Sequence, residues 1–257
     1  MNSNNPVLSR GFGQGQYATF NTPTPQASDL QGMYDRPAYA PPRYMTLDDV
    51  VMRTAACLGV LIATGAVAYA LELGALALVG ALVGFVLALV ISFRQSTNPA
   101  LILAYSACEG LFLGGISRLF EDRYSGIVIQ AVVGTAAVFG GMLVVYKTGA
   151  IRVTPKFTRW LLGALIGVVG LMLVNLVVSL FTENGLHLRD GGPLAIVFSL
   201  VCIGIAALTF LLDFDLIDQA IRRGAPERFA WYAAFGLVVG LVWLYLEILR
   251  LLSYFRD

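Results

Sequence analysis

Long apolar stretches, separated by short polar breaks, recur from about residue 50 to the end of the chain. Each is close to the roughly 20 residues that a helix rising about 1.5 Å per residue needs to cross about 30 Å of hydrocarbon. The apolar residues run continuously instead of alternating, so the stretches lack the pattern of barrel strands. The chain is therefore predicted to be an all-α integral membrane protein, a bundle of seven transmembrane helices. We expect these helices over residues 50–72, 74–93, 99–120, 124–146, 159–181, 193–214 and 229–254.

Prolines and glycines within these stretches favour a compact bundle. Four prolines fall at or shortly before the starts of the third, fifth, sixth and seventh stretches, where a missing N–H costs little. Glycines four residues apart let helix backbones approach closely in lipid. Chance spacing among 27 glycines is the alternative explanation for any one pair. The pairs are Gly80 with Gly84, Gly110 with Gly114, Gly163 with Gly167, and Gly236 with Gly240.

The first 49 residues differ in composition from the rest of the chain. They hold six of the ten prolines, are rich in Asn, Gln, Ser and Tyr, and contain no apolar run. A segment of this kind buries too little apolar surface to fold, so we expect it to be disordered. We also expect no cleavable signal peptide, since no apolar region follows Met1. The predicted division is a Pro-rich tail over residues 1–49 and a membrane domain over residues 50–257.

Composition and charge narrow the classes of function. The chain is 58% hydrophobic and 13% charged, with a mean hydropathy of +0.75, so its partner is the lipid bilayer. The net charge of +1 leaves no basic surplus for binding nucleic acid. The three cysteines lie in separate apolar stretches, and the one histidine, His187, builds neither a catalytic triad nor a zinc pair. We expect no enzyme, no bound metal and no cofactor, while the oligomeric state stays open.

Lysine and arginine are distributed unevenly between the two sides of the predicted bundle. Twelve of the 17 basic residues fall on the side of the N-terminal tail and five fall on the other side. Loops rich in Lys and Arg are retained in the cytoplasm. We therefore expect the N-terminus in the cytoplasm and, with seven spans, the C-terminus outside.

Acidic residues inside the predicted spans are the main candidates for function. An ionised side chain at the centre of a bilayer costs roughly 2.5–3.5 kcal/mol, so it normally faces a cavity or a partner. Glu109 lies near the middle of the third span, and Asp213 lies near the end of the sixth. Glu247, in the seventh, lies three residues before Arg250 on one helix face, and the two side chains can pair. Glu109 either lines an ion or proton path or is a protonated packing residue, and the Glu247–Arg250 pair has a purely structural alternative.

Three groups of residues occur together in this chain. They are residues 98–114 with Glu109-Gly110, the segment Leu212-Asp213-Phe214, and residues 244–250. Together they resemble the Bax inhibitor-1 family, in its bacterial YccA-like branch, over residues 50–255. The resemblance implies a multi-pass protein of the bacterial plasma membrane in which the last helix is central and surrounded by the other six.

The resemblance also implies a function. In this family one acid from each of the last two spans forms a pH-sensitive latch on a calcium leak, and an arginine at the end of the second span pairs with it in the closed state. Matched by motif, these residues are Asp213, Glu247 and Arg94. Two carboxyls that share a proton repel each other once it leaves, and oxygen ligands suit calcium, the transported ion.

Two hypotheses of different classes follow. The first is a pH-sensitive cation leak, with Glu109 as a candidate for the ion path. The alternative is a membrane interaction protein that regulates a membrane protease or another membrane partner and transports nothing. A single cavity faced by Glu109, Asp213 and Glu247 favours the first hypothesis, and acids buried separately favour the second.

Overall fold

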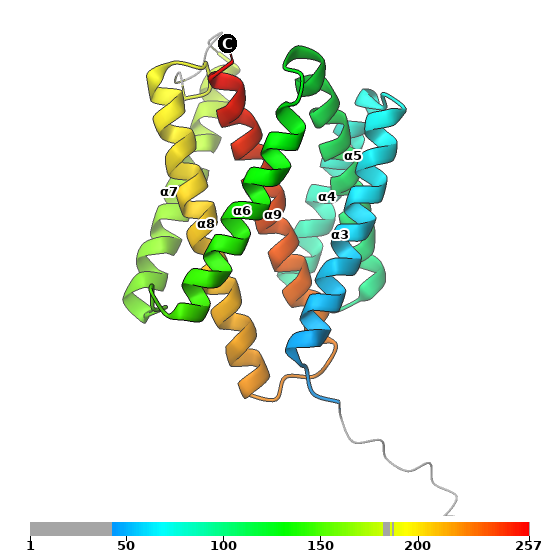
Figure 1. Cartoon of the computed structure of the whole chain (residues 1–257), viewed down its shortest axis with the longest axis vertical. Coiled ribbons are helices and arrows are strands. Elements are labelled where there is room, and N and C mark those ends of the chain that lie inside the picture. Colours follow the sequence, from blue (N-terminus) through cyan, green and yellow to red (C-terminus); the bar gives the residue numbers. More distant parts are fainter. Residues whose placement is uncertain (1–42, 182–185, 187, 257) are drawn as a thin grey trace, which may run out of the picture. The chain divides into compact units, whose positions relative to one another are not determined.

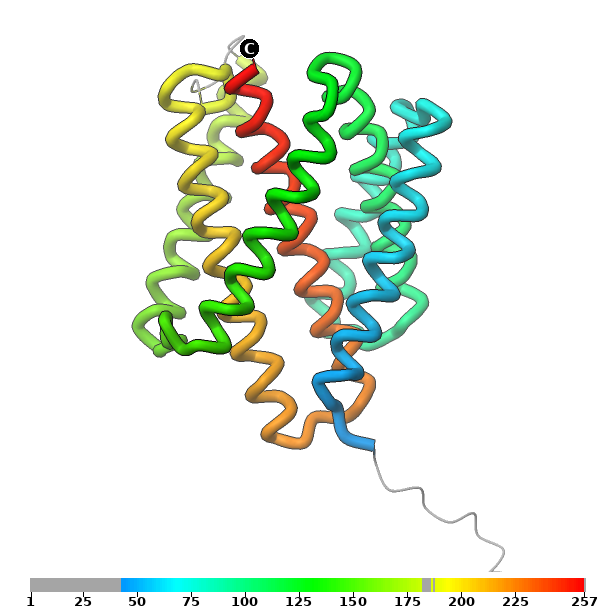
Figure 2. The backbone as a smooth tube through the Cα atoms, in the orientation of Figure 1, coloured from blue at the N-terminus to red at the C-terminus, as the bar shows by residue number. Residues whose placement is uncertain are grey.

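The computed structural model describes residues 43–181, 186 and 188–256, and these form an all-helical bundle (Figures 1 and 2). All seven of its helices are long and apolar enough to cross a membrane. Most of the predicted tail, and His187, lie outside the described residues. The helices are α3 (Leu47–Ala70), α4 (Gly74–Arg94), α5 (Pro99–Arg123), α6 (Ile127–Thr148), α7 (Pro155–Ser179), α8 (Pro193–Arg222) and α9 (Phe229–Tyr254).

The seven predicted spans are confirmed, and all but one of their ends lie within four residues of the observed ends. The exception is α8, which continues eight residues beyond its predicted end at residue 214. Its extra turns are polar and are stabilised by contacts at i and i+4, which hydropathy alone does not detect. Gln219 donates to Asp215 at 2.6 Å, and Arg222 pairs with Asp218 at 2.9 Å.

Local sequence explains where several helices begin. Thr46 caps α3, and Asp49 bonds back to it in a capping box. Asn98 and Thr154 cap α5 and α7 immediately before a proline at the first helical position. Gly149 ends α6 at a φ of 68°, a conformation that glycine adopts without strain. These signals set the ends of the spans independently of their apolar content.

Helix α9 lies at the centre of the bundle (Figure 1). It packs mainly against α3, α5, α6 and α8, while α4 packs chiefly on α5, and α7 on α8. Half of the most apolar window of α9 is buried inside the protein, compared with 11% for α7. The central last helix is therefore confirmed, although four of the other helices, not six, provide its main contacts.

The glycine pairs differ in what they do. A Cβ added at Gly80 would lie 2.7 Å from the carbonyl oxygen of Cys108, so α4 and α5 are in close backbone contact there. Gly110 and Gly114 of α5 are likewise in close contact with the α3 backbone, so they mark the contact between α3 and α5. Gly163, like Gly167 beside it on α7, faces open space. The prediction of close approach is thus confirmed for α3, α4 and α5 and is wrong for α7, which lies at the edge of the bundle.

The end of the bundle that carries Arg43, here called the N-terminal end, is tied together by polar contacts. Arg53 of α3 donates to the backbone oxygen of Glu227 at 2.7 Å and pairs with its side chain at 2.5 Å. The Arg53 guanidinium also lies 5.6 Å from the centre of the Trp231 ring. These contacts connect the start of α3 to the α8–α9 loop, and thereby hold the start of α9. The opposite end, with Tyr254, is called the C-terminal end.

Candidate functional site: acids around the last helix

Glu109 is buried in the middle of α5, with 9% of its surface exposed. Its side chain faces α4 at Gly84, where an added Cβ would lie 3.1 Å from Glu109 Oε1. The missing side chain at Gly84 therefore provides the space for this carboxyl group. Glu109 forms no ion pair within the part of the chain that the structure describes.

Tyr105 connects the Glu109 region to the central helix. It precedes Glu109 by four residues, so both side chains lie on one face of α5. The Tyr105 ring packs edge-on against Phe235 of α9, with ring centres 5.0 Å apart. Glu109 thus lies about one helical turn from a direct contact with α9.

Asp213 lies at the contact between α8 and α9. It is half-buried, and its Oδ1 lies 4.0 Å from the position that a Cβ of Gly236 would occupy. Asp215 and Asp218 point to partners on their own helix, so they differ from Asp213 in position and in contacts. No ion pair of Asp213 occurs among the described residues. It is therefore the acid of α8 that faces the central helix.

Glu247 lies in the C-terminal half of α9 and is only 2% exposed. Arg250 Nη1 donates to its Oε1 at 2.9 Å, so the predicted pair is confirmed. Arg189, from the segment before α8, approaches the same oxygen at 3.6 Å. The other oxygen, Oε2, is buried without a hydrogen-bond partner among the described residues. Two guanidinium groups thus hold one buried carboxylate.

Sequence reasoning did not identify Arg189 as part of this cluster. The contact joins residues 58 positions apart, and no spacing rule links them. The sequence provided only a general indication: five basic residues lie on this side of the bundle, and any of them could pair with the acid at Glu247. Burial lowers the pKa of Arg189 below its ordinary value, the neighbouring Arg250 lowers it further, and Glu247 opposes both effects. Arg189 is therefore in an environment that requires the carboxylate beside it.

The structure does not bring Asp213 and Glu247 together. Glu247 follows Gly236, the neighbour of Asp213, by eleven residues of one continuous helix, which is about 16 Å along the helix axis. Two carboxyls at this separation do not share a proton. The physical reason is the polar extension of α8 and the loop after it, which place Asp213 opposite the N-terminal half of α9.

Arg94 is likewise apart from the other predicted site residues. It ends α4 in an exposed position, and it forms no ion pair with a described residue. The main neighbours of α4 are α5 and α3, whereas α8 packs against α9, α6, α7 and α3. The expected contact between Arg94 and Asp213 is therefore absent from the described part of the chain, since their helices lie in different parts of the bundle.

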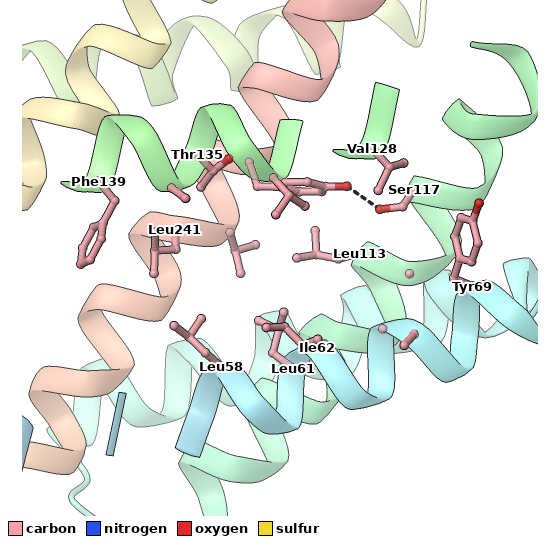
Figure 3. Close-up of a pocket in the computed structure, with 17 residues that line it drawn as sticks. Leu58, Leu61, Ile62, Tyr69, Leu113, Ser117, Val128, Thr135, Phe139 and Leu241 are labelled. Carbon is pink, nitrogen blue, oxygen red and sulfur yellow. Dashed lines mark hydrogen bonds between the residues drawn. The ribbon is translucent and has the colours of Figure 1, made fainter. Parts of the chain in front are cut away.

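Two cavities lie beside the central helix, and none of the three acids lines either of them. A polar cavity of about 420 Å³ at the C-terminal end is lined by the side chains of Arg123, Arg189 and Arg250. An apolar cavity of about 470 Å³ opens between α3 and α6 (Figure 3). In the described ranges, no three His, Cys, Asp or Glu side chains are grouped as a metal site would require. The acids are thus buried separately in this conformation.

Seven membrane-spanning helices with the last one central, and three acidic side chains within these spans, define a polytopic membrane protein. A family model described as Bax inhibitor 1 like matches residues 5–257, and the chain belongs to this family. The match begins within the N-terminal tail, well before residue 50, where the resemblance among the spans begins. Family membership is thus confirmed over nearly the whole chain.

One relative comes from Chlamydia muridarum (strain MoPn / Nigg), where it is described as an uncharacterized protein. It is 32% identical to this chain over 126 residues, which cover 49% of this chain and 48% of the relative. The chain therefore spans about half the length of this curated relative. No solved structure matches the chain.

Proposed function

We propose that this protein is a pH-sensitive cation leak of the bacterial plasma membrane, with calcium as the transported ion. The observation that carries the proposal is the position of Glu109 and Asp213. Both carboxyls lie within membrane-spanning helices near α9, without an ion-pair partner among the described residues. Carboxylate oxygens are suitable ligands for a hard cation such as calcium.

The described conformation corresponds in this proposal to the closed state. In its N-terminal half, α9 faces Asp213 with Gly236. Towards the C-terminal end, Arg189 from the segment before α8 holds α9 through Glu247. Because neither of the two cavities beside α9 is lined by Asp213 or Glu247, opening requires α9 to separate from a neighbouring helix. Asp213 and Glu247 therefore hold α9 at two different depths. In this proposal the latch is formed by these two separate sites, and the two carboxyls do not share a proton.

The sign of the pH response follows from the cost of charge in a membrane. A protonated Asp213 packs against α9 as a neutral group, whereas the ionised form requires water or a cation. Raising the pH increases the ionised fraction, so it favours separation of α8 from α9. The leak is therefore proposed to increase with pH.

The proposed orientation places the N-terminus in the cytoplasm and the C-terminus outside. Its support is the distribution of basic residues, twelve on the side of the N-terminal tail and five on the other. Asp213 then lies towards the cytoplasmic side, and the Arg189–Glu247–Arg250 cluster lies towards the outside. The cytoplasmic pH is consequently the one that Asp213 senses.

A second candidate function is favoured by a specific observation, the separate positions of Glu109, Asp213 and Glu247, which share neither of the two cavities. In a YccA-like regulator of a membrane protease or of another membrane partner, the acids would only stabilise the helix bundle and would take no part in transport. Helix α7 supplies a surface for such a partner, since 11% of its most apolar window is buried and residues such as Trp160 and Ile166 are exposed. This candidate predicts no transport by the protein alone.

Calcium flux into vesicles that contain only the purified protein distinguishes the two functions. The leak proposal predicts flux above that of protein-free vesicles. Folded, reconstituted protein without flux would overturn it and leave the regulator. A matched cation such as Mg²⁺, tested in the same vesicles, then establishes the selectivity.

A further inference from the structure

An apolar slot lies between α3 and α6 (Figure 3), two helices that are long and apolar enough to cross a membrane. The two helices form its rims, and they pack against α9 instead of closely against each other. Ile62 and Val132, on the rims, are 64% and 53% exposed. Leu113 of α5 and Val242 of α9, both 8% exposed, form its recessed inner wall. The slot therefore has an open side towards lipid and a wall deep in the bundle.

Small side chains create this space. The lining includes Ala66 on α3 and Ala136 on α6. Larger residues at these two places would fill the slot from both rims. Its volume of about 470 Å³ falls in the range of about 300–1,000 Å³ typical of ligand pockets.

Three hydroxyl groups in the slot already form hydrogen bonds within the protein. Ser117 Oγ and Tyr245 OH share a hydrogen bond of 2.6 Å, drawn as the dashed line in Figure 3. Thr135 Oγ1 donates to the backbone oxygen of Ala131 at 2.7 Å. Apart from these hydroxyl groups and that of Tyr69 at one extremity, the lining is apolar, and apolar cavities stay dry. The slot is consequently a dry space that apolar matter fills.

The dimensions of the slot select its occupant. Its lining follows α3 from Leu58 to Tyr69, about 16 Å along the helix axis. This length is close to half of the hydrocarbon core of about 30 Å, which is the depth that the acyl chains of one leaflet cover. A single extended hydrocarbon chain that enters from one surface of the membrane therefore matches the length of the slot.

The position of the slot also gives the occupant a direction. Tyr69 and Val128, at one extremity, lie beside the end of α3 and the start of α6, where the helices reach the membrane surface. Leu58 and Phe139, at the other extremity, lie near the middle of their helices. At the surface extremity, the guanidinium of Arg118 lies 5.4 Å from the centre of the Tyr69 ring. A chain in the slot thus has its polar end at the interface and its tail towards the midplane.

We propose that this slot is a binding site for one acyl chain of a membrane phospholipid. The lipid comes from the half of the bilayer at the C-terminal end of the bundle, and its chain rests against α5 and α9 behind the rims. The site is independent of ion transport, because none of the three buried acids lines it. A bound chain supports α9 two residues before Glu247, through Tyr245.

Photo-crosslinking in vesicles of phosphatidylethanolamine and phosphatidylglycerol tests the proposal. The probe is a phosphatidylcholine with a diazirine midway along one acyl chain, and adducts are located by peptide mass spectrometry. Lipid that merely surrounds the bundle reaches Ile62 and Val132. A chain in the slot also reaches Leu241 and Leu113 on the inner wall. Adducts on the inner wall of the wild-type protein are the expected result, and adducts confined to outer faces would overturn the proposal.

Filling the slot provides the second arm of the experiment. Ala66→Trp and Ala136→Trp, on different rims, should each abolish the inner-wall adducts and retain those on outer faces. Ala137→Trp is the matched control, since Ala137 is exposed and does not line the slot. Inner-wall adducts that persist in both folded variants would contradict the site. An isoprenoid that co-purifies in place of an acyl lipid would contradict the assigned chemistry.

Discussion

The Glu247 cluster yields a quantitative prediction for the variant Glu247→Gln. The substitution keeps the size of the side chain but removes the negative charge from between two guanidinium groups. In the wild type, the carboxylate lies 2.9 Å from Arg250 and 3.6 Å from Arg189. In the variant, the two positive side chains face each other without a counter-charge, so the free energy of unfolding decreases.

The magnitude follows from the burial of the three groups. Breaking a fully buried ion pair costs about 3–5 kcal/mol. Here the side chain of Glu247 is 3% exposed, but those of Arg189 and Arg250 are 34% and 24% exposed, so water compensates part of the loss. We expect a loss of about 1–3 kcal/mol. Each kcal/mol corresponds to about 2–4 °C in Tm for a chain of this length.

Thermal unfolding of the purified protein in detergent measures this effect. Glu247→Gln, Arg250→Gln and the double variant form a cycle, and the double variant should lose less than the two single variants together. The control is Asp218→Asn, because Asp218 and Arg222 lie at the same 2.9 Å but are exposed. Its effect should stay within about 0.5 kcal/mol. Equal losses at the two pairs, or strictly additive losses in the cycle, would refute the reasoning.

Three further predictions concern packing, the ion path and orientation. Gly80→Ala should lower the free energy of unfolding by about 1–3 kcal/mol, because the added methyl group forces α4 away from α5. Gly163→Ala is the control and should leave stability unchanged, because Gly163 faces open space. Equal unfolding temperatures of the two variants would contradict this packing. Glu109→Gln should keep the unfolding temperature but lower calcium flux, and unchanged flux would leave Glu109 as a packing residue. A reporter fused after Asp257 should be active only outside and one in residues 147–159 only inside, while the reverse pattern would refute the orientation.

The fold was predictable because its main signals are local. Continuous apolar stretches of about 20 residues have few alternatives in a membrane, and prolines such as Pro99 and Pro193 mark helix starts directly. The polar end of α8 was not predictable from hydropathy, since a hydrogen bond and an ion pair between residues one turn apart extend it. The open face at Gly163 was also not predictable, because the spacing of glycines along one helix does not indicate whether another helix packs against them.

The candidate site was predictable residue by residue but not as an arrangement. Glu109 and Glu247 were identified because a carboxyl in an apolar stretch is costly, and that rule needs no partner. The pair of Glu247 with Arg250 follows from helical spacing. The distance between Asp213 and Glu247 depends on where α8 ends and how the next loop turns. The contact of Arg189 depends on tertiary packing alone.

Calcium flux as a function of pH tests the central claim most directly. Vesicles containing only the purified wild type, Asp213→Asn or Asp215→Asn are compared from about pH 5 to about pH 8, a range in which carboxyls inside proteins change charge. Asp215 is the matched control, because it lies two residues from Asp213 but contacts Gln219 instead of α9. We predict that flux through the wild type and Asp215→Asn rises with pH and that the response of Asp213→Asn is flat. Three superimposable profiles, or no flux above protein-free vesicles, would contradict the account.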